Sequence, residues 1–241
     1  MTLRLLQRTW DQFGGTDPLW AILTDPAKRG NRWETGEFFA TGRGEIQGVL
    51  KHVAALGLEM PHRRALDFGC GVGRLTRALG EHFESVDGVD IAPPMIALAR
   101  RFHPETAACR FHVNRRSSLD MFADRSFDFI YSNITLQHMP PRLSRRYIRE
   151  FLRLLAAGGV LVFQLPGTRR GLSRWRSAVA EAHQWYLRLT AASPFMEMHG
   201  VKKERVIRLV ESRGGRVVQY LDDGNAGLEW TSHTYYVTRN R

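Results

Sequence analysis

The sequence predicts an α/β fold with a mostly parallel sheet. Short apolar segments alternate with segments of helical periodicity along most of the chain, which is typical of strands joined by helices. Residues 160–166 are mostly apolar, as expected for a parallel strand covered on both faces. A length of 241 residues suits one such domain. Ligands of such folds bind where the carboxyl ends of the strands meet.

Each element follows from a local pattern of apolar residues, glycines and prolines. The expected strands cover residues 63–71, 85–92, 109–114, 126–133 and 160–166, followed by a late pair at 215–221 and 233–239. The expected helices cover residues 43–58, 73–83, 92–102, 141–157 and 201–215, with an extra helix around 173–191. Gly158 and Gly159 are expected to cap the helix before them. The late strands allow an antiparallel pair at one sheet edge, and residues 1–35 look irregular or made of short helices.

Composition excludes several classes of protein. With 43% hydrophobic residues the chain can bury a core, so it is not intrinsically disordered. No apolar run approaches the ~20 residues that a membrane-spanning helix needs, and the first residues do not form a secretory signal. Cys70 and Cys109 are too few for a disulfide scaffold, and no cluster of metal ligands is evident. We therefore expect a cytoplasmic protein without a membrane partner or a metal.

The net charge of +11 invites a nucleic-acid partner. However, 31 of the 35 basic residues are Arg, a bias that often reflects a GC-rich genome, and they are spread along the whole chain. A nucleic-acid surface would concentrate them on one element or face. A nucleic-acid partner is therefore an alternative hypothesis and not the favoured one.

Three glycines at alternate positions, Gly69, Gly71 and Gly73, follow the first expected strand and Asp67. Glycine adopts positive φ and lets a ligand approach the backbone. A dinucleotide fingerprint, G-x-G-x-x-G, does not fit. Its last glycine would fall at Arg74 or Thr76.

The pattern D-x-G-x-G-x-G instead resembles motif I of the class I S-adenosylmethionine-dependent methyltransferases, and the resemblance extends over residues 63–165. It implies a Rossmann-like, seven-stranded sheet with helices on both faces, and S-adenosyl-L-methionine as cofactor. The chain would be a single methyltransferase domain. Its parts would be an N-terminal helical cover (1–42), the cofactor-binding core (63–165), a substrate lid inserted after the fifth strand (166–200), and a C-terminal helix and strand pair (201–241).

The resemblance also assigns roles to the glycine loop and the second strand. Gly69, Gly71 and Gly73 would form the floor under the amino-acid portion of the cofactor. Asp67 would orient that loop and meet the cofactor's amino group through water. Asp90, which ends the second strand, would hold both ribose hydroxyls.

Further cofactor contacts are expected along the same edge. Ile91 would contact adenine, Ser118 and Leu119 would lie at the adenine edge, and the Asn133 backbone would approach the cofactor. Arg43 is a candidate partner for the cofactor's carboxylate, because guanidinium–carboxylate contacts are strong and directional.

His138 is the leading catalytic base, since many small-molecule methyltransferases have a histidine after the fourth strand and a neutral imidazole accepts a hydroxyl proton. Gln137 is a candidate orienting group for the substrate, and His199 is a second base candidate. The other candidate substrate-binding residues are Trp185, Glu229 and Trp230.

We therefore expect methyl transfer to an oxygen of a small molecule, such as a hydroxylated metabolite or a saccharide, with nitrogen and carbon acceptors left open. RNA methylation is an alternative supported only by charge. The stretch Ser132-Asn133-Ile134-Thr135 lacks the Asn/Asp-Pro-Pro-aromatic signature of many base methylases. A non-catalytic binding module is a further alternative, against which the intact glycines and Asp90 argue.

Overall fold

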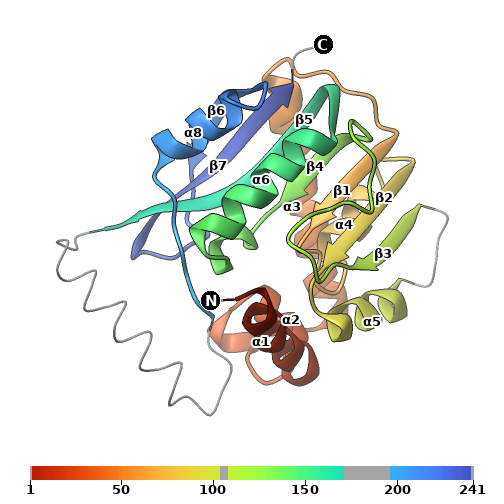
Figure 1. Cartoon of the computed structure of the whole chain (residues 1–241). Coiled ribbons are helices and arrows are strands. Elements are labelled where there is room, and N and C mark those ends of the chain that lie inside the picture. Colours follow the sequence, from red (N-terminus) through yellow and green to blue (C-terminus); the bar gives the residue numbers. More distant parts are fainter. Residues whose placement is uncertain (1, 104–107, 171–195, 240–241) are drawn as a thin grey trace.

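A seven-stranded sheet forms the centre of the computed structural model, which describes residues 2–103, 108–170 and 196–239 (Figure 1). The strand order is β3-β2-β1-β4-β5-β7-β6, and only β7 runs antiparallel to its neighbours. The strands are β1 (Arg64–Phe68), β2 (Ser85–Asp90), β3 (Cys109–Val113), β4 (Phe127–Ser132), β5 (Leu155–Arg169), β6 (Gly215–Asp222) and β7 (Trp230–Arg239). The predicted Rossmann-like fold is therefore confirmed, and the chain order reverses between β1 and β4, where ligands of such sheets bind.

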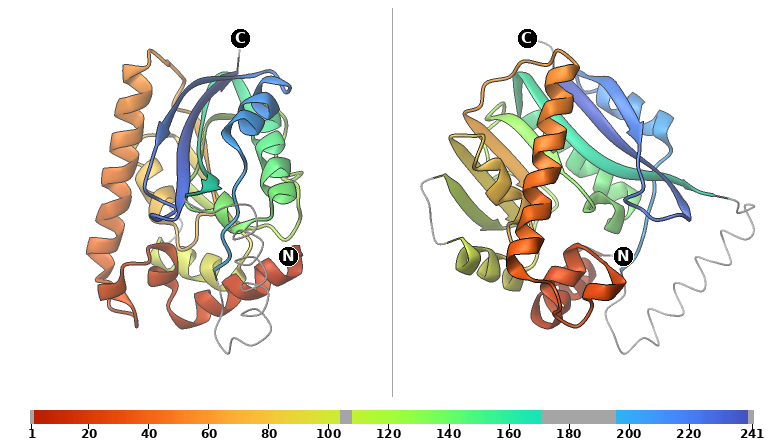
Figure 2. Two further views of the ribbon diagram at one scale, coloured as in Figure 1. Left: turned by 90° about the vertical axis from the view of Figure 1, so that its left-hand side faces the viewer. Right: turned by 180° about the vertical axis from the view of Figure 1, so that it is seen from behind.

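Helices cover both faces of the sheet, as Figure 2 shows. They are α3 (Thr35–Ala55), α4 (Arg74–Leu79) and α5 (Pro93–Phe102) on one face, and α6 (Pro141–Leu154) and α8 (Lys203–Glu211) on the other. Neighbouring residues of a strand divide between the two faces: Ala65 packs with the first group and Leu66 with the second. The strands are thus buried on both sides, which explains their nearly continuous apolar sequences.

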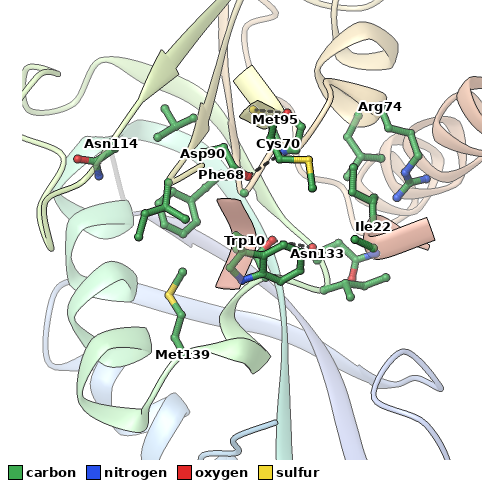
Figure 3. Close-up of a pocket in the computed structure, with 18 of the residues that line it drawn as sticks. Trp10, Ile22, Phe68, Cys70, Arg74, Asp90, Met95, Asn114, Asn133 and Met139 are labelled. Atoms are coloured by element: carbon green, nitrogen blue, oxygen red, sulfur yellow. Dashed lines mark hydrogen bonds between the residues drawn. The ribbon is translucent and has the colours of Figure 1, made fainter. Parts of the chain in front are cut away.

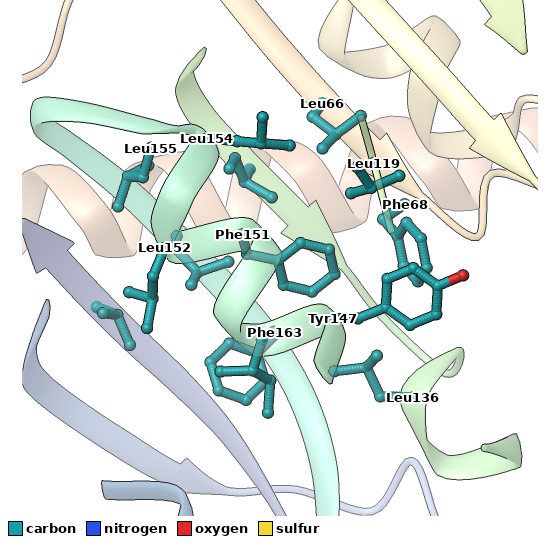
Figure 4. Close-up of a cluster of buried hydrophobic side chains, with 14 of the residues drawn as sticks. Leu66, Phe68, Leu119, Leu136, Tyr147, Phe151, Leu152, Leu154, Leu155 and Phe163 are labelled. Carbon is teal, nitrogen blue, oxygen red and sulfur yellow. The ribbon is translucent and has the colours of Figure 1, made fainter. Parts of the chain in front are cut away.

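The larger core cluster lies between the sheet and α6 (Figure 4). Phe151 is fully buried there, and its ring lies 5.0 Å from the ring of Phe68. Because Phe68 is the last residue of β1, this packing holds the strand end from which the glycine loop starts.

The N-terminal segment packs across the carboxyl ends of the strands (Figure 1). It forms α1 (Leu3–Thr16), α2 (Pro18–Ile22) and a short 3-10 helix, η1 (Pro26–Lys28). A third apolar cluster joins it to α3, to α5 and to the glycine loop, through Phe13, Phe38, Phe39, Val72 and Met95. The first helix has fourteen residues and is capped by the Thr2 hydroxyl, so this segment is more regular than the sequence suggested.

Several helix boundaries differ from the sequence prediction. The helices expected over 73–83 and 201–215 end at Leu79 and Glu211. The helix expected over 141–157 ends at Leu154, because Leu155 is extended and pairs with Phe127 in the sheet. Gly158 has the expected positive φ of 74°, but it lies within β5 and not at a helix cap. The helix expected from residue 43 begins at Thr35, where the Glu34 carboxylate accepts a hydrogen bond from a backbone N–H. The extra helix expected around 173–191 lies outside the described residues.

No helix in the described ranges is both long enough and apolar enough to span a membrane.

Replacing Phe151 by alanine is expected to lower the free energy of unfolding by about 3–5 kcal/mol, since it leaves a cavity in a closed core. Chemical denaturation followed by circular dichroism measures this change. Met121→Ala, at a side chain that is 49% exposed, is the control and should change stability by less than about 0.5 kcal/mol. Equal stability of the two variants would contradict the assigned core.

Candidate active site

The glycine loop bends sharply after β1. Gly69, Gly71 and Gly73 have φ values of 82°, 53° and 86°, a region that favours glycine. A Cβ atom at Gly69 would collide with the Thr135 side chain, and one at Gly71 would lie 2.5 Å from Ile22 Cδ1. The loop therefore needs glycine both for its backbone conformation and for its close packing against the segments on either side.

Asp67 lies beneath this loop and is almost completely buried. Its Oδ2 accepts a hydrogen bond of 2.6 Å from the hydroxyl of Thr76, on α4. Burial raises the pKa of Asp67 to about 7. Asp67 does not line the cavity described below, and its hydrogen bond joins β1 to α4, the two elements that the glycine loop connects.

Asp90, the last residue of β2, joins the second strand to the glycine loop. Its Oδ2 accepts from the Gly71 N–H at 3.0 Å, and its Oδ1 accepts from the Ala92 N–H at 2.8 Å. Burial raises the pKa of Asp90, although these two backbone contacts act in the opposite direction. Each carboxylate oxygen has a further lone pair with which to accept from a ligand.

A cavity, which we call the inner cavity, opens above Asp90 and the loop. It is lined by five residues that we expected to contact the cofactor: Gly69, Gly71, Asp90, Ile91 and Asn133. The N-terminal helices contribute further lining residues: Leu6, Trp10, Ala21 and Ile22. Figure 3 shows Asn114 at one end of the cavity and Arg74 at the other, with Asp90 and Cys70 between them. Gly73 does not line it; a Cβ there would lie 2.8 Å from the His103 ring.

Arg74 supplies a buried cation to one end of the inner cavity. Its guanidinium donates to Glu45 Oε2 at 2.7 Å and to Thr41 Oγ1 at 3.3 Å, and its side chain is only 3% exposed. Its Nε is buried without a hydrogen-bond partner among the described residues. Glu45 also accepts from Tyr131 and from the Asn133 amide, each at 2.8 Å. The network holds Arg74 and Asn133 in one wall.

Arg43, in contrast, is exposed on α3 and does not line the inner cavity. The sequence reasoning chose the wrong arginine for this wall. Arg74 follows directly after the third glycine, so it starts α4 beside the cavity. That position in the sequence was the signal from which Arg74 could have been identified.

Ser118 and Leu119 are also placed away from the inner cavity. The Ser118 hydroxyl donates to Asp120 at 2.6 Å, and Ser118 lines a neighbouring surface hollow that shares only Asn114 with the inner cavity. Leu119 is fully buried in the core, and its N–H donates to Glu150. Asn114 takes their place: it is 4% exposed, and its amide donates to the Ser118 carbonyl at 3.0 Å. Asn114 comes directly after β3, in a position comparable to that of Asp90 at the end of β2. This position was a signal that the sequence reasoning missed.

This arrangement fits an elongated nucleoside that carries an amino acid. The Asp90 oxygens suit a pair of hydroxyls, the Arg74 guanidinium suits a carboxylate, and the Asn114 amide suits a polar base edge. The glycine floor, where added Cβ atoms would collide with neighbours, leaves the loop backbone exposed to such a ligand. The described residues therefore fit S-adenosyl-L-methionine.

A second cavity, the outer cavity, adjoins the first and shares Ala21, Ile22 and Ile134 with it. Its other walls are lined by Leu23, Thr24, Asp25, Trp33, Gln137, His138, Met196, Met198, Asn225, Ala226 and Gly227. Ile134 has a φ of 54°, which is strained for a β-branched residue and costs about 1–3 kcal/mol. The strain is thus located where the two cavities meet.

His138 ends a short 3-10 helix, η2 (Leu136–His138), and is 5% exposed. Its Nδ1 lies 2.8 Å from the Glu197 carbonyl oxygen, and the edge of the Trp10 ring packs against it at 5.3 Å. Burial lowers the pKa of His138 to about 4. The imidazole is therefore neutral at physiological pH.

The remaining substrate candidates are spread more widely. Gln137 is buried beside His138, and its carbonyl accepts from the His199 N–H at 2.7 Å. His199 Nε2 lies 3.0 Å from a Glu197 carboxylate oxygen. His199 lines neither cavity.

Two further candidates lie on β7 or just before it. Glu229 is exposed and Trp230 lies under the Arg169 guanidinium at 5.1 Å, and neither lines either cavity. Trp185 lies outside the described residues, as does most of the insertion expected at 166–200. Within the described ranges, no group of three or more His, Cys, Asp or Glu side chains could hold a metal ion.

Comparisons with known proteins agree with this geometry. The family model described as "Methyltransferase domain" matches residues 66–163. The chain is similar to a 2-methyl-6-phytyl-1,4-hydroquinone methyltransferase from Synechocystis, with 33% identity over 48% of this chain and 38% of the relative. It is also similar to a ubiquinone biosynthesis O-methyltransferase from Xanthomonas campestris, with 30% identity over 54% of each chain. The chain thus spans about half or less of these curated relatives.

Among solved structures, magnesium protoporphyrin IX methyltransferase from Synechocystis, with bound SAH, has a similar fold. The TM-score is 0.65 with 15% identity, and the match covers 98% of this chain and 99% of that one. Residues 66–163 therefore match a methyltransferase domain, and the chain has the Rossmann-like fold of a solved methyltransferase.

Proposed function

We propose that this protein methylates an oxygen of a hydroxylated small molecule, such as a metabolite or a saccharide, with S-adenosyl-L-methionine as methyl donor. One observation carries the proposal. The inner cavity, with its carboxylate and glycine floor, meets at Ile134 an outer cavity that contains the neutral imidazole of His138. A donor in one cavity and an acceptor in the other would meet at that junction.

The inner cavity supplies the contacts for the cofactor. Asp90 would accept from the ribose hydroxyls, Arg74 would pair with the carboxylate, and Asn114 would contact the adenine edge. When bound, the cofactor supplies a methyl group activated by a sulfonium. Trp10 and Ile22 line the same cavity from α1 and α2. This supports a role for residues 1–42 as a cover that excludes water.

His138 would act on the acceptor. The Glu197 carbonyl can only accept, so Nδ1 carries the proton and Nε2 carries the lone pair. Nε2 would take the hydroxyl proton as the oxygen is methylated. A base of this kind typically contributes ~10²–10⁴-fold to the rate.

The residues that line the outer cavity indicate which kind of acceptor molecule would fit there. Trp33, Met196, Met198 and Ile134 offer aromatic and apolar surface, while Asn225 offers an amide at the mouth. Such a lining suits a mostly apolar or ring-shaped molecule with few hydroxyls. The relative that carries O-methyltransferase in its name supports oxygen as the acceptor atom.

Asp90→Ala should weaken binding of S-adenosyl-L-methionine at least tenfold, about 1.4 kcal/mol, since it removes both acceptor oxygens and frees the glycine loop. Isothermal calorimetry measures this. Asp124→Ala is the matched control, because that side chain is 70% exposed and pairs only with Arg153 among the described residues. An unchanged dissociation constant in Asp90→Ala would sink the assignment, and no heat in the wild type would favour a non-catalytic module.

His138→Ala should lower turnover ~10²–10⁴-fold while binding the cofactor almost as tightly as the wild type, because His138 lines only the outer cavity. The acceptor is first found by screening hydroxylated compounds with methyl-labelled cofactor. Turnover of the variant is then compared with calorimetric cofactor affinity. Equal turnover would remove His138 from the reaction.

The acid limb of kcat/KM is expected near pH 4, not near the ordinary histidine value of 6.5. The rate should fall as the pH falls through that value, because protonation removes the Nε2 lone pair. Initial rates measured between pH 3.5 and 8, at pH values where circular dichroism shows the fold intact, test this. A limb near 6.5 would contradict the buried, neutral state of His138.

A further inference from the structure

A line of buried amides ends on the ring of His138. Gln164, on β5, donates from Nε2 to Ser232 Oγ at 2.7 Å and to Gln137 Oε1 at 3.1 Å. Gln137 in turn places its Nε2 3.3 Å from His138 Nε2. Each of these side chains is 5% exposed or less. The line therefore joins β7, β5 and η2 inside the protein.

The direction of each hydrogen bond follows from how the Gln164 amide is placed: its nitrogen faces Ser232 Oγ and Gln137 Oε1, and its buried oxygen has no hydrogen-bond partner among the described residues. An amide nitrogen has two hydrogens, and Gln164 uses one for each of its two contacts. Gln137 must then present its oxygen to Gln164 and its NH₂ group to His138. An NH₂ group can face His138 Nε2 only when that nitrogen carries a lone pair.

The contact on the opposite side of the His138 ring requires the same tautomer. The Glu197 carbonyl accepts from Nδ1 at 2.8 Å, which requires the proton on Nδ1. If the Gln137 amide were turned over, its NH₂ group would face the NH₂ group of Gln164, and its oxygen would face the Nε2 lone pair. Both contacts would be repulsive. Gln164 thus prevents the arrangement that would favour a proton on Nε2.

We propose that Gln164 is a positioning residue that acts through Gln137 to keep the proton of His138 on Nδ1 and the lone pair on Nε2. The inference rests on the proposed role of His138 as the base. The contact between Gln137 and His138 is long at 3.3 Å and therefore weak. An acceptor hydroxyl can replace it without disturbing the stronger bonds behind it.

The test reads the His138 ring directly and needs no acceptor. Long-range ¹H–¹⁵N correlation spectra distinguish the two neutral tautomers and the imidazolium, and the His138 signals are assigned by their loss in His138→Ala. The wild type should show the Nδ1–H tautomer. Gln164→Glu, recorded near pH 8, replaces a double donor by a carboxylate that only accepts. Gln137 should then turn over, and the His138 signals should change to the Nε2–H form or the imidazolium.

The pH titration of the same signals provides a second readout. The turned Gln137 oxygen and the new negative charge should both raise the pKa of His138, by about one unit or more. Two other titratable groups among the described residues, the Glu197 carboxylate and His199, lie close to this ring. They are unchanged in the variant.

Gln219→Glu is the matched control, because it makes the same change beside another histidine. Gln219 Oε1 lies 2.6 Å from His52 Nε2, so only the His52 signals should respond. Should Gln164→Glu fail to fold, Gln164→Met keeps the length and removes both donors, and it should give a mixture of His138 tautomers. A wild type with the Nε2–H form, or wild-type His138 signals in the folded Gln164 variants, would overturn the inference. Correct spectra from a protein that binds no cofactor would overturn only the proposed function.

Discussion

The hydrogen bond between the Asp90 carboxylate and the Gly71 N–H holds the cavity together. It joins the end of β2 to the loop after β1, beside the place between β1 and β4 where the chain order of the sheet reverses. The loop reaches this position only because glycine tolerates its positive φ and its close approach to Thr135 and Ile22. Without this bond, the floor of the inner cavity and the start of α4 would lose their common anchor.

A second constraint connects the two cavities. Glu45 accepts from Arg74, Tyr131 and Asn133, and the Asn133 oxygen accepts from Asn225 in the loop between β6 and β7. One carboxylate therefore fixes groups from α4, β4 and, through Asn133, the mouth of the outer cavity. Because a half-satisfied buried network costs stability, these groups keep a common geometry, and donor and acceptor sides stay aligned.

The segment after β4 contains both a strained backbone residue and a buried titratable side chain. Ile134 adopts a left-handed backbone conformation where the cavities meet, and four residues later His138 is buried as a neutral ring. Strained residues persist only where their surroundings determine them fully. Here the segment that follows β4 packs against the glycine loop through Thr135, against Trp10 through His138, and against Gln164 of β5 through Gln137. The catalytic chemistry that we propose depends on all three.

The sequence by itself determined the α/β fold, the glycine loop and the placing of Asp90, Ile91 and Asn133 at the cavity. These depend on features that can be recognised locally: hydrophobic periodicity, positive φ at glycine, and the rule that the carboxyl ends of parallel strands lie along the same edge of the sheet. Tertiary structure decided what depends on distant partners. Arg74 and not Arg43 reaches the cavity because Glu45 and Thr41 hold it, and Asn114 lines the cavity where Leu119 is packed in the core and Ser118 lines the neighbouring hollow. The tautomer of His138 is likewise set by Glu197, 59 residues away, and, through Gln137, by Gln164 of β5, and no local pattern encodes such a contact.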